Sequence, residues 1–239
     1  MGGHRHAAQP ARRHGSLVAA GCVAVLVVGV IGGVAWTTGV GRAGHHSLHA
    51  RGAAAENSPM NTLHGSERDA VPGACDTLSA SIATKLAPGA DRSETVATQT
   101  DEHSECAWSD YGANRSRQLN VELRAISADG GTSAADTAIR TFNEEWSSDR
   151  KGKDLADGAK VHDSRGVTGV GEQAYVVYMV DGPIGTAVAN ARLANVLITV
   201  HYSGGDHLET HGRPLSSGTA GDGALQAARD IISKLESHS

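Results

Sequence analysis

The chain has 239 residues, of which 39% are hydrophobic, and a formal net charge of -5 at pH 7. This length can supply one hydrophobic core of ordinary size together with accessory segments. The acidic balance argues against the basic class of nucleic-acid-binding proteins, so no nucleic acid is expected as a partner. Aromatic residues are few, three Trp, four Tyr and one Phe. Val, Ile, Leu and Ala must therefore fill the core, and each aromatic residue marks a candidate core position.

The N-terminal region contains a long apolar run. Residues 17–36 carry no charged side chain, and a helix of about 20 residues spans the roughly 30 Å hydrocarbon layer of a bilayer. The preceding residues contain arginines and no acidic side chain, which predicts that the N-terminus lies in the cytoplasm. We therefore predict a basic cytoplasmic segment over residues 1–16 and a transmembrane anchor over residues 17–40. The rest of this single-pass cell-membrane protein is expected to be extracytoplasmic.

Two alternatives to a permanent anchor remain open. The residues Ala19-Ala20-Gly21 before Cys22 resemble the small-residue site of a lipoprotein signal, although most of the apolar run follows Cys22. A cleaved secretory peptide is the other alternative, although the run is long for one and no clear cleavage site follows it. Either alternative leaves the remainder of the chain outside the cytoplasm.

Residues 41–72 are rich in Gly, Ala, His, Ser and Asn and show no helical or strand period. This composition predicts a flexible extracytoplasmic tether. His45, His46 and His49 lie close together within it, but no Cys or carboxylate stands beside them at metal-ligand spacing. A spacer that contains histidines is therefore favoured over a metal site.

Cys75 and Cys106 are the two cysteines outside the predicted membrane segment. Disulfides persist in extracytoplasmic compartments, so we predict that these two residues are bonded. A cross-link that closes a loop of about 30 residues stabilises a small domain by roughly 3.5 to 4 kcal/mol. Two cysteines alone do not complete a tetrahedral metal site, which makes metal binding the weaker interpretation.

We predict an extracytoplasmic domain over residues 73–239. Its first half begins with a short helix. Leu78, Ile82 and Leu86 recur at helical spacing before Pro88, which ends the helix. A strand that opens at Cys106-Ala107-Trp108 and a second strand over residues 118–126 follow as an antiparallel hairpin. In the second strand the apolar residues alternate with Asn120, Glu122 and Arg124, which predicts one core face and one wet face. The apolar residues are Leu119, Val121 and Leu123.

The second half continues with a helix over about residues 133–147, which starts at a capping-box pattern of Ser133 and Asp136. We interpret residues 148–168 as a surface connection. Three antiparallel strands are predicted next, over residues 174–180, 186–192 and 195–202. A polar, glycine-rich stretch over residues 203–223 leads to a final helix. Its apolar stripe consists of Leu225, Ala228, Ile232 and Leu235. The order of elements favours the α+β class, with an antiparallel sheet covered by helices.

One glycine motif invites a cofactor interpretation. Residues 169–174, GVGEQA, fit the G-x-G-x-x-G/A pattern of dinucleotide-binding proteins. That fingerprint requires a helix after the glycines, because the helix N-terminus holds the pyrophosphate. Here a β pattern, YVVYMV, follows instead. We therefore interpret Gly169 and Gly171 as a turn into a strand and Tyr175 as a packing or hydrogen-bonding residue at the strand start. No cofactor is expected.

Several motifs occur in an order that resembles a family of actinobacterial cell-envelope proteins of unknown function, many of which are lipoproteins. The matching residues are Cys75, Cys106-Ala107-Trp108, Gly169 to Tyr175 and Arg192 to Tyr202. The resemblance covers about residues 73–237. It implies an α/β sandwich similar to the photosystem extrinsic protein P group, with paired cysteines, and it brings no catalytic residues. The chain departs from many members by its predicted transmembrane segment in place of a lipid-modified cysteine.

The common motifs of nucleophilic, metalloprotease and phosphate-binding sites do not occur in the sequence. The best remaining cluster is His201, His207 and His211 with Asp206 and Glu209 nearby. Its spacing matches no common zinc pattern, so a polar loop is favoured over a metal site.

The function predicted from the sequence is a non-enzymatic binding or protein-interaction module in the cell envelope. Its partner would be an envelope protein, a lipid or a small ligand, reached from the flexible tether. The alternative is an envelope hydrolase or transferase with an unrecognised Ser, His and Asp combination. A pocket that places Ser or His beside a buried carboxylate would favour the enzyme, and an apolar groove would favour the binding module.

Overall fold

The structure is a computed structural model that describes residues 67–94, 99–153 and 155–237. Every described residue belongs to the unit of residues 52–239. The predicted cytoplasmic segment, the membrane anchor and most of the tether, with its three histidines, lie outside the described residues. In the described part of the chain, no helix has the length and apolar content needed to cross a bilayer.

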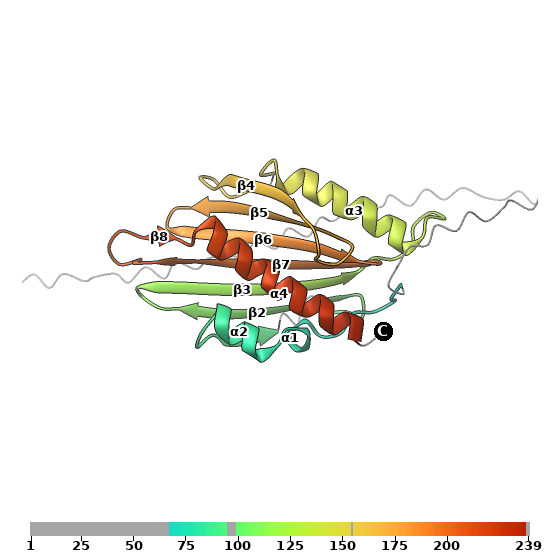
Figure 1. Cartoon of the computed structure of the whole chain (residues 1–239), viewed down its shortest axis with the longest axis horizontal. Coiled ribbons are helices and arrows are strands. Elements are labelled where there is room, and N and C mark those ends of the chain that lie inside the picture. Colours follow the sequence, from blue (N-terminus) through green and yellow to red (C-terminus); the bar gives the residue numbers. More distant parts are fainter. Residues whose placement is uncertain (1–66, 95–98, 154, 238–239) are drawn as a thin grey trace, which may run out of the picture. The chain divides into compact units, whose positions relative to one another are not determined.

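An antiparallel sheet of eight strands forms the centre of the described unit (Figure 1). Seven strands lie in the order β1-β2-β3-β7-β6-β5-β4, and β8 pairs with β7. The strands are β1 (Asp91–Glu94), β2 (His103–Tyr111), β3 (Arg115–Ala125), β4 (Lys160–Val167), β5 (Gln173–Asp181), β6 (Ile184–Leu193), β7 (Val196–Asp206) and β8 (Arg213–Pro214). The predicted hairpin corresponds to β2 and β3, and the three predicted C-terminal strands correspond to β5, β6 and β7. The α+β class and the antiparallel sheet are confirmed.

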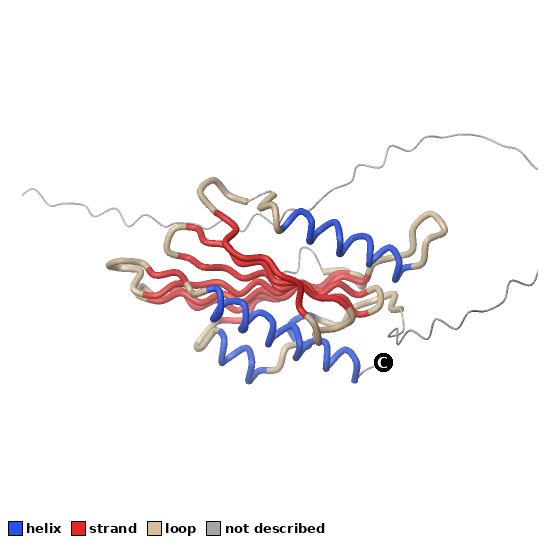
Figure 2. The backbone as a smooth tube through the Cα atoms, turned by 45° about the horizontal axis from the view of Figure 1, so that its top comes forward, coloured by secondary structure: helices blue, strands red, loops and turns tan. Residues whose placement is uncertain are grey.

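Within the described ranges, four helices cover the sheet unequally. They are α1 (Ala74–Thr77), α2 (Ala80–Leu86), α3 (Ala134–Asp149) and α4 (Ser217–Ser237). In Figure 2 α3 lies on one side of the sheet, while α1, α2 and α4 lie on the other. We call the side of α1, α2 and α4 the first face and the side of α3 the second face. The larger core lies between the first face and its helices, and a smaller core lies beneath α3.

The central strand β7 shows how the sequence supplies both cores. Val196, Ile198 and Val200 are fully buried on the first face. Leu197 points to the second face and belongs to the core under α3. Alternate residues of a strand point to opposite sides of a sheet, so β7 contributes apolar side chains to both cores.

The C-terminal region differs from the prediction of a polar stretch over residues 203–223. β7 continues to Asp206, β8 follows, and α4 begins at Ser217, well before the first predicted helical residue. Ser216 begins this helix by accepting a hydrogen bond from the Thr219 backbone amide at 3.1 Å. Glycines near the start of α4 lower its intrinsic helix propensity, but burial of this turn against the sheet compensates for that loss.

Three further elements also differ from the predictions. The surface connection predicted over residues 148–168 contains the edge strand β4. The short exposed strand β1 has no apolar residue that could have indicated it. The first helix is two helices, α1 and α2, separated by the extended residue Leu78.

The folded body also begins before residue 73. The Arg68 backbone amide donates to Asn195 Oδ1 at 2.8 Å, and the Val71 amide donates to the Asp101 carbonyl oxygen at 2.7 Å. These contacts attach the segment to the β6–β7 turn and to the residues before β2.

Candidate functional site

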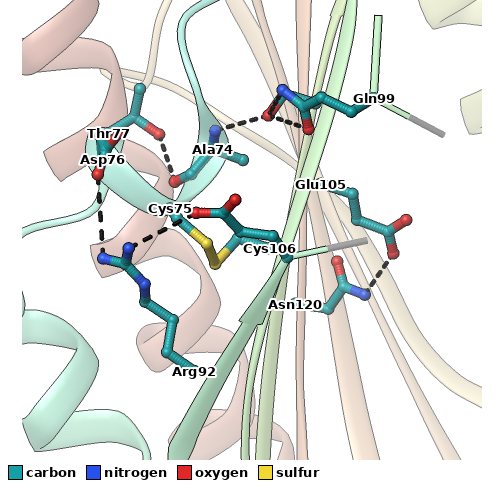
Figure 3. The surroundings of a disulfide bond; sticks show 11 residues. Ala74, Cys75, Asp76, Thr77, Arg92, Gln99, Glu105, Cys106 and Asn120 are labelled. Carbon is teal, nitrogen blue, oxygen red and sulfur yellow. Dashed lines mark hydrogen bonds and ion pairs between the residues drawn. A yellow bond between two sulfur atoms is a disulfide. The ribbon is translucent and has the colours of Figure 1, made fainter. Parts of the chain in front are cut away.

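The predicted disulfide is present between Cys75 in α1 and Cys106 in β2 (Figure 3). The two Cα atoms are 5.1 Å apart. Cys75 is 5% exposed and Cys106 is fully buried. Beside the bond, the Ala74 amide donates to Ser104 Oγ at 2.7 Å and so joins α1 to the same strand. A buried bond between the helix layer and the sheet is suited to a structural role, because access of reductants to the sulfur atoms is limited.

The glycine motif at residues 169–174 enters strand β5 and does not begin a helix. Gly169 and Gly171 have φ angles of 73° and 55°, in the left-handed region that favours glycine. A Cβ atom at Gly171 would lie 2.5 Å from the Arg192 carbonyl oxygen. The neighbouring Glu172 forms an ion pair with the buried Arg192 at 2.7 Å. The motif is therefore a structural connection between the turn and β6.

Tyr175, the first aromatic residue of β5, anchors α3 to the second face. Its hydroxyl donates to Asp149 Oδ2 at 2.7 Å and accepts a hydrogen bond from Asn190 Nδ2 at 2.6 Å. Thr199 Oγ1 donates to Asn190 Oδ1 at 2.5 Å and extends the network to β7. Trp146 of α3 stacks on the Tyr175 ring, with ring centroids 5.5 Å apart. Tyr175 is fully buried, and this network holds α3 against the sheet.

Beside α3, the second face of β2, β3 and β7 carries polar residues that remain partly accessible. We call this set the polar patch. It consists of His103, Glu105, Asn120, Glu122, Arg124 and His201. The strand pairing places Glu105 opposite Glu122, and Asn120 opposite His201. Figure 3 shows Glu105 and Asn120 on the side of the strands away from the disulfide. His201 is exposed and the other members are half-buried.

Hydrogen bonds hold most of the polar patch in a defined arrangement. Glu122 Oε1 lies 2.9 Å from His103 Nε2 and 3.3 Å from Arg124 Nε. Arg124 also donates to Glu145 of α3 at 2.7 Å. Asn120 Nδ2 donates to Glu105 Oε1 at 2.7 Å. The patch therefore offers ordered carboxylate oxygens at its surface, which are suited to receiving hydrogen bonds from a cationic or polar group.

The electrostatics around the patch are predominantly acidic. Burial raises the pKa of Glu145 above its ordinary value, and Arg124 opposes that rise. Glu105 and Glu122 face each other across the β2–β3 ladder, although like charges directly opposite each other destabilise a sheet. The fold places these two carboxylates on neighbouring strands of one surface, where Arg124 and His103 lie beside Glu122 and Asn120 donates to Glu105.

The sequence pattern indicates the wet face of β3 but not the patch. The alternation in residues 118–126 correctly placed Asn120, Glu122 and Arg124 on a polar face. It contained no information that β3 lies between β2 and β7. That neighbourhood, which brings His103 and His201 to the same surface, is a property of the sheet order.

The three histidines that lie near one another in the sequence are separated in the fold. His201 lies on the second face of β7, whereas His207 and His211 lie in the exposed loop between β7 and β8. Within the described ranges, no group of three or more His, Cys, Asp or Glu side chains is arranged to hold a metal ion.

No protein-family model matches the sequence of this chain, and no curated protein matches it either.

Proposed function

We propose that the chain is a membrane-anchored, extracytoplasmic binding module without enzymatic activity, and that the polar patch is its binding surface. The observation that carries the proposal is the unequal cover of the sheet. Three helices lie over the first face, whereas α3 on the second face leaves His201 exposed. The buried disulfide supports the extracytoplasmic location, because such bonds persist in oxidising compartments.

The chemistry of the patch favours a partner with basic groups. The patch contains two carboxylates, Glu105 and Glu122, and one permanently charged cation, Arg124, which pairs with Glu122 and with Glu145 of α3. A lysine or arginine of an envelope protein could form charge-assisted hydrogen bonds with these oxygens. Binding would also relieve the repulsion between the facing glutamates. The proposal includes membership of the actinobacterial envelope family and its α/β sandwich similar to the photosystem extrinsic protein P group, which the arrangement of helices on both sides of the sheet supports.

Site-specific photo-cross-linking in intact cells tests the proposal. A photoreactive amino acid would replace exposed His201 in the patch, and a matched variant would carry it at exposed Arg229 on α4. We expect a discrete protein adduct from position 201 only. Glu105→Gln, introduced together with the position-201 probe, should weaken that adduct, because it removes one carboxylate charge and leaves a side chain of similar size.

The outcomes separate specific recognition from random contact. Identical adducts from positions 201 and 229, or no adduct from position 201, would contradict a binding surface at the patch. An adduct from position 201 that is insensitive to Glu105→Gln would show that the acidic groups do not recognise the partner.

A further inference from the structure

A row of neutral polar side chains crosses the second face beside the polar patch. Its members come from four adjacent strands, and the strand pairing places each of them opposite the next. Neighbouring strands lie about 4.8 Å apart, so the row extends over roughly 14 Å. We call it the neutral row. It consists of Ser109 of β2, Gln118 of β3, Ser203 of β7 and Thr186 of β6.

The neutral row lies beyond the part of the second face that α3 covers. In Figure 1 α3 lies toward the end of the strands that is opposite the β2–β3 and β5–β6 turns. It is anchored there through Asp149, which contacts Tyr175 near the start of β5 and Asn190 near the end of β6. The row lies nearer the two turns, and its four side chains are half-buried. Their neighbours in the strands belong to the first-face core, so the row points to the second face. These neighbours are Trp108, Leu119, Tyr202 and Ala187.

The side chains of the neutral row have unused hydrogen-bonding capacity. Within the described ranges, none of the four has a hydrogen-bond partner in the protein, whereas Glu105 and Asn120 in the polar patch are bonded to each other. Each hydroxyl or amide group of the row can both donate and accept. The row therefore offers alternating donors and acceptors without charge, which suits the hydroxyl groups of a neutral ligand better than an ionic group.

An exposed aromatic ring adjoins the β2 end of the neutral row. Tyr111 follows Ser109 on the same face of β2 and is 66% exposed. No other large hydrophobic side chain is exposed in the part of the chain that the structure describes. An exposed ring of this kind marks a contact site, and the C–H face of a sugar ring packs on tyrosine while its hydroxyl groups bind polar neighbours. Asp91 of β1, opposite Ser109, adds one carboxylate acceptor at the same end.

We propose that the neutral row and Tyr111 bind a neutral, extended glycan chain with β-1,4 linkages. One sugar ring would pack on Tyr111, and the following sugars would bind Gln118, Ser203 and Thr186 in turn. Sugars in such a chain repeat at an interval close to the distance between neighbouring strands, so successive sugars meet successive side chains of the row. The ligand and the residues differ from the protein partner and the carboxylates of the polar patch, and either proposal can fail without the other.

Calorimetric titration with cellotetraose, the β-1,4-linked tetramer of glucose, tests the proposal on the full chain in phospholipid nanodiscs. We expect one tetramer to bind per chain. Maltotetraose has the same sugars in α-1,4 linkage, and its chain coils instead of extending. It should bind about ten-fold more weakly, the effect of losing one or two hydrogen bonds to the row.

Three variants and a matched control locate the ligand. Tyr111→Ala should weaken cellotetraose binding by about five-fold through loss of ring packing, and Tyr111→Phe, which keeps the ring, should retain most of it. Gln118→Ala should also weaken binding by about five-fold, because it removes an amide from the middle of the row. Gln226→Ala removes a half-buried glutamine from α4 and should leave binding unchanged. Circular dichroism shows that each variant is folded.

Four outcomes would overturn the proposal. Absence of binding heat with cellotetraose would reject a glycan site, and a protein adduct from a photoreactive residue at position 118 in intact cells would then assign the row to a protein partner. Equal binding of cellotetraose and maltotetraose would reject alignment of an extended chain with the row. Binding that is insensitive to both Tyr111→Ala and Gln118→Ala would place the sugar elsewhere on the molecule.

Discussion

On the second face, burial changes how readily the side chain of Asp149 loses its proton. Its carboxylate accepts hydrogen bonds from the Tyr175 hydroxyl and from Asn190 Nδ2, at 2.7 and 3.3 Å. Burial raises the pKa of Asp149 above its ordinary value of 3.8, although the hydrogen bond from Tyr175 acts in the opposite direction. The folded protein therefore holds the Asp149 proton more tightly than the unfolded chain does.

This difference in proton affinity predicts a pH-dependent effect of Asp149→Asn. A carboxyl group whose pKa is raised by folding contributes most to stability in acid, and the contribution decreases as the pH rises above 3.8. An asparagine oxygen can accept the same hydrogen bonds without titrating. The melting temperature of the wild type minus that of the variant should therefore fall between pH 4 and pH 7, as measured by circular dichroism.

Glu144→Gln, an exposed change on the same helix, is the control for removing one carboxylate from α3. A melting-temperature difference for Asp149→Asn that rises with pH would mean that the folded protein stabilises the charged form, contrary to the effect of burial.

At the scale of elements, helices with a regular apolar stripe were the easiest to predict. α3 begins at Ser133, whose Oγ accepts a hydrogen bond from the Asp136 amide at 3.1 Å, as the capping pattern indicated. The core side of α3 carries the buried residues Ala134, Ala138 and Phe142, whereas Ala135 and Ile139 are half-buried. Edge strand β4 could not be predicted in this way, because it has few apolar residues and is held by its ladder to β5.

The same limit applies to the start of α4 and to the candidate site. Glycine has a low helix propensity, which predicts against a helix at the start of α4. Helix propensity takes no account of a neighbouring side chain that packs where the Cβ atom of any other residue would lie. The polar patch was only half visible in the sequence for a similar reason. Local alternation shows which way a side chain points, whereas the sheet order decides which side chains meet.

Two glycines of α4 are predicted to respond oppositely to alanine. A Cβ atom at Gly223 would lie 2.6 Å from Tyr202 Cδ1. The Tyr202 ring cannot easily move, because its hydroxyl donates to the Leu86 carbonyl oxygen at 2.9 Å. At Gly221 the nearest atoms would be at ordinary contact distances of 3.6 and 3.9 Å.

Gly223→Ala should therefore lower the free energy of unfolding by about 1 to 3 kcal/mol through overpacking. Gly221→Ala should raise it by up to about 1 kcal/mol through helix propensity. Urea denaturation of the two variants measures both changes, and equal effects of the two substitutions would contradict the proposed contact between α4 and β7.

At the scale of the whole molecule, the N-terminal and C-terminal parts of the described unit close over the same end of the sheet. Arg68 contacts Leu235 at the end of α4, and Ser79 donates from its backbone amide to Asp230 Oδ2 at 2.7 Å. The disulfide adds a covalent connection between α1 and β2 across a sequence separation of 31 residues. The layer of α1 and α2 therefore depends on contacts that are distant in sequence.

Replacing both cysteines, Cys75→Ala with Cys106→Ala, should lower the free energy of unfolding by about 3 to 4 kcal/mol, because the unfolded chain regains the entropy of an open loop. A reductant added under denaturing conditions should destabilise the wild type by a similar amount and leave the double variant unchanged. Hydrogen exchange should increase most in α1 and α2, since the central strands β6 and β7 retain partners on both sides. Equal loss of protection in all elements would instead show that the helix layer and the sheet unfold as one cooperative unit.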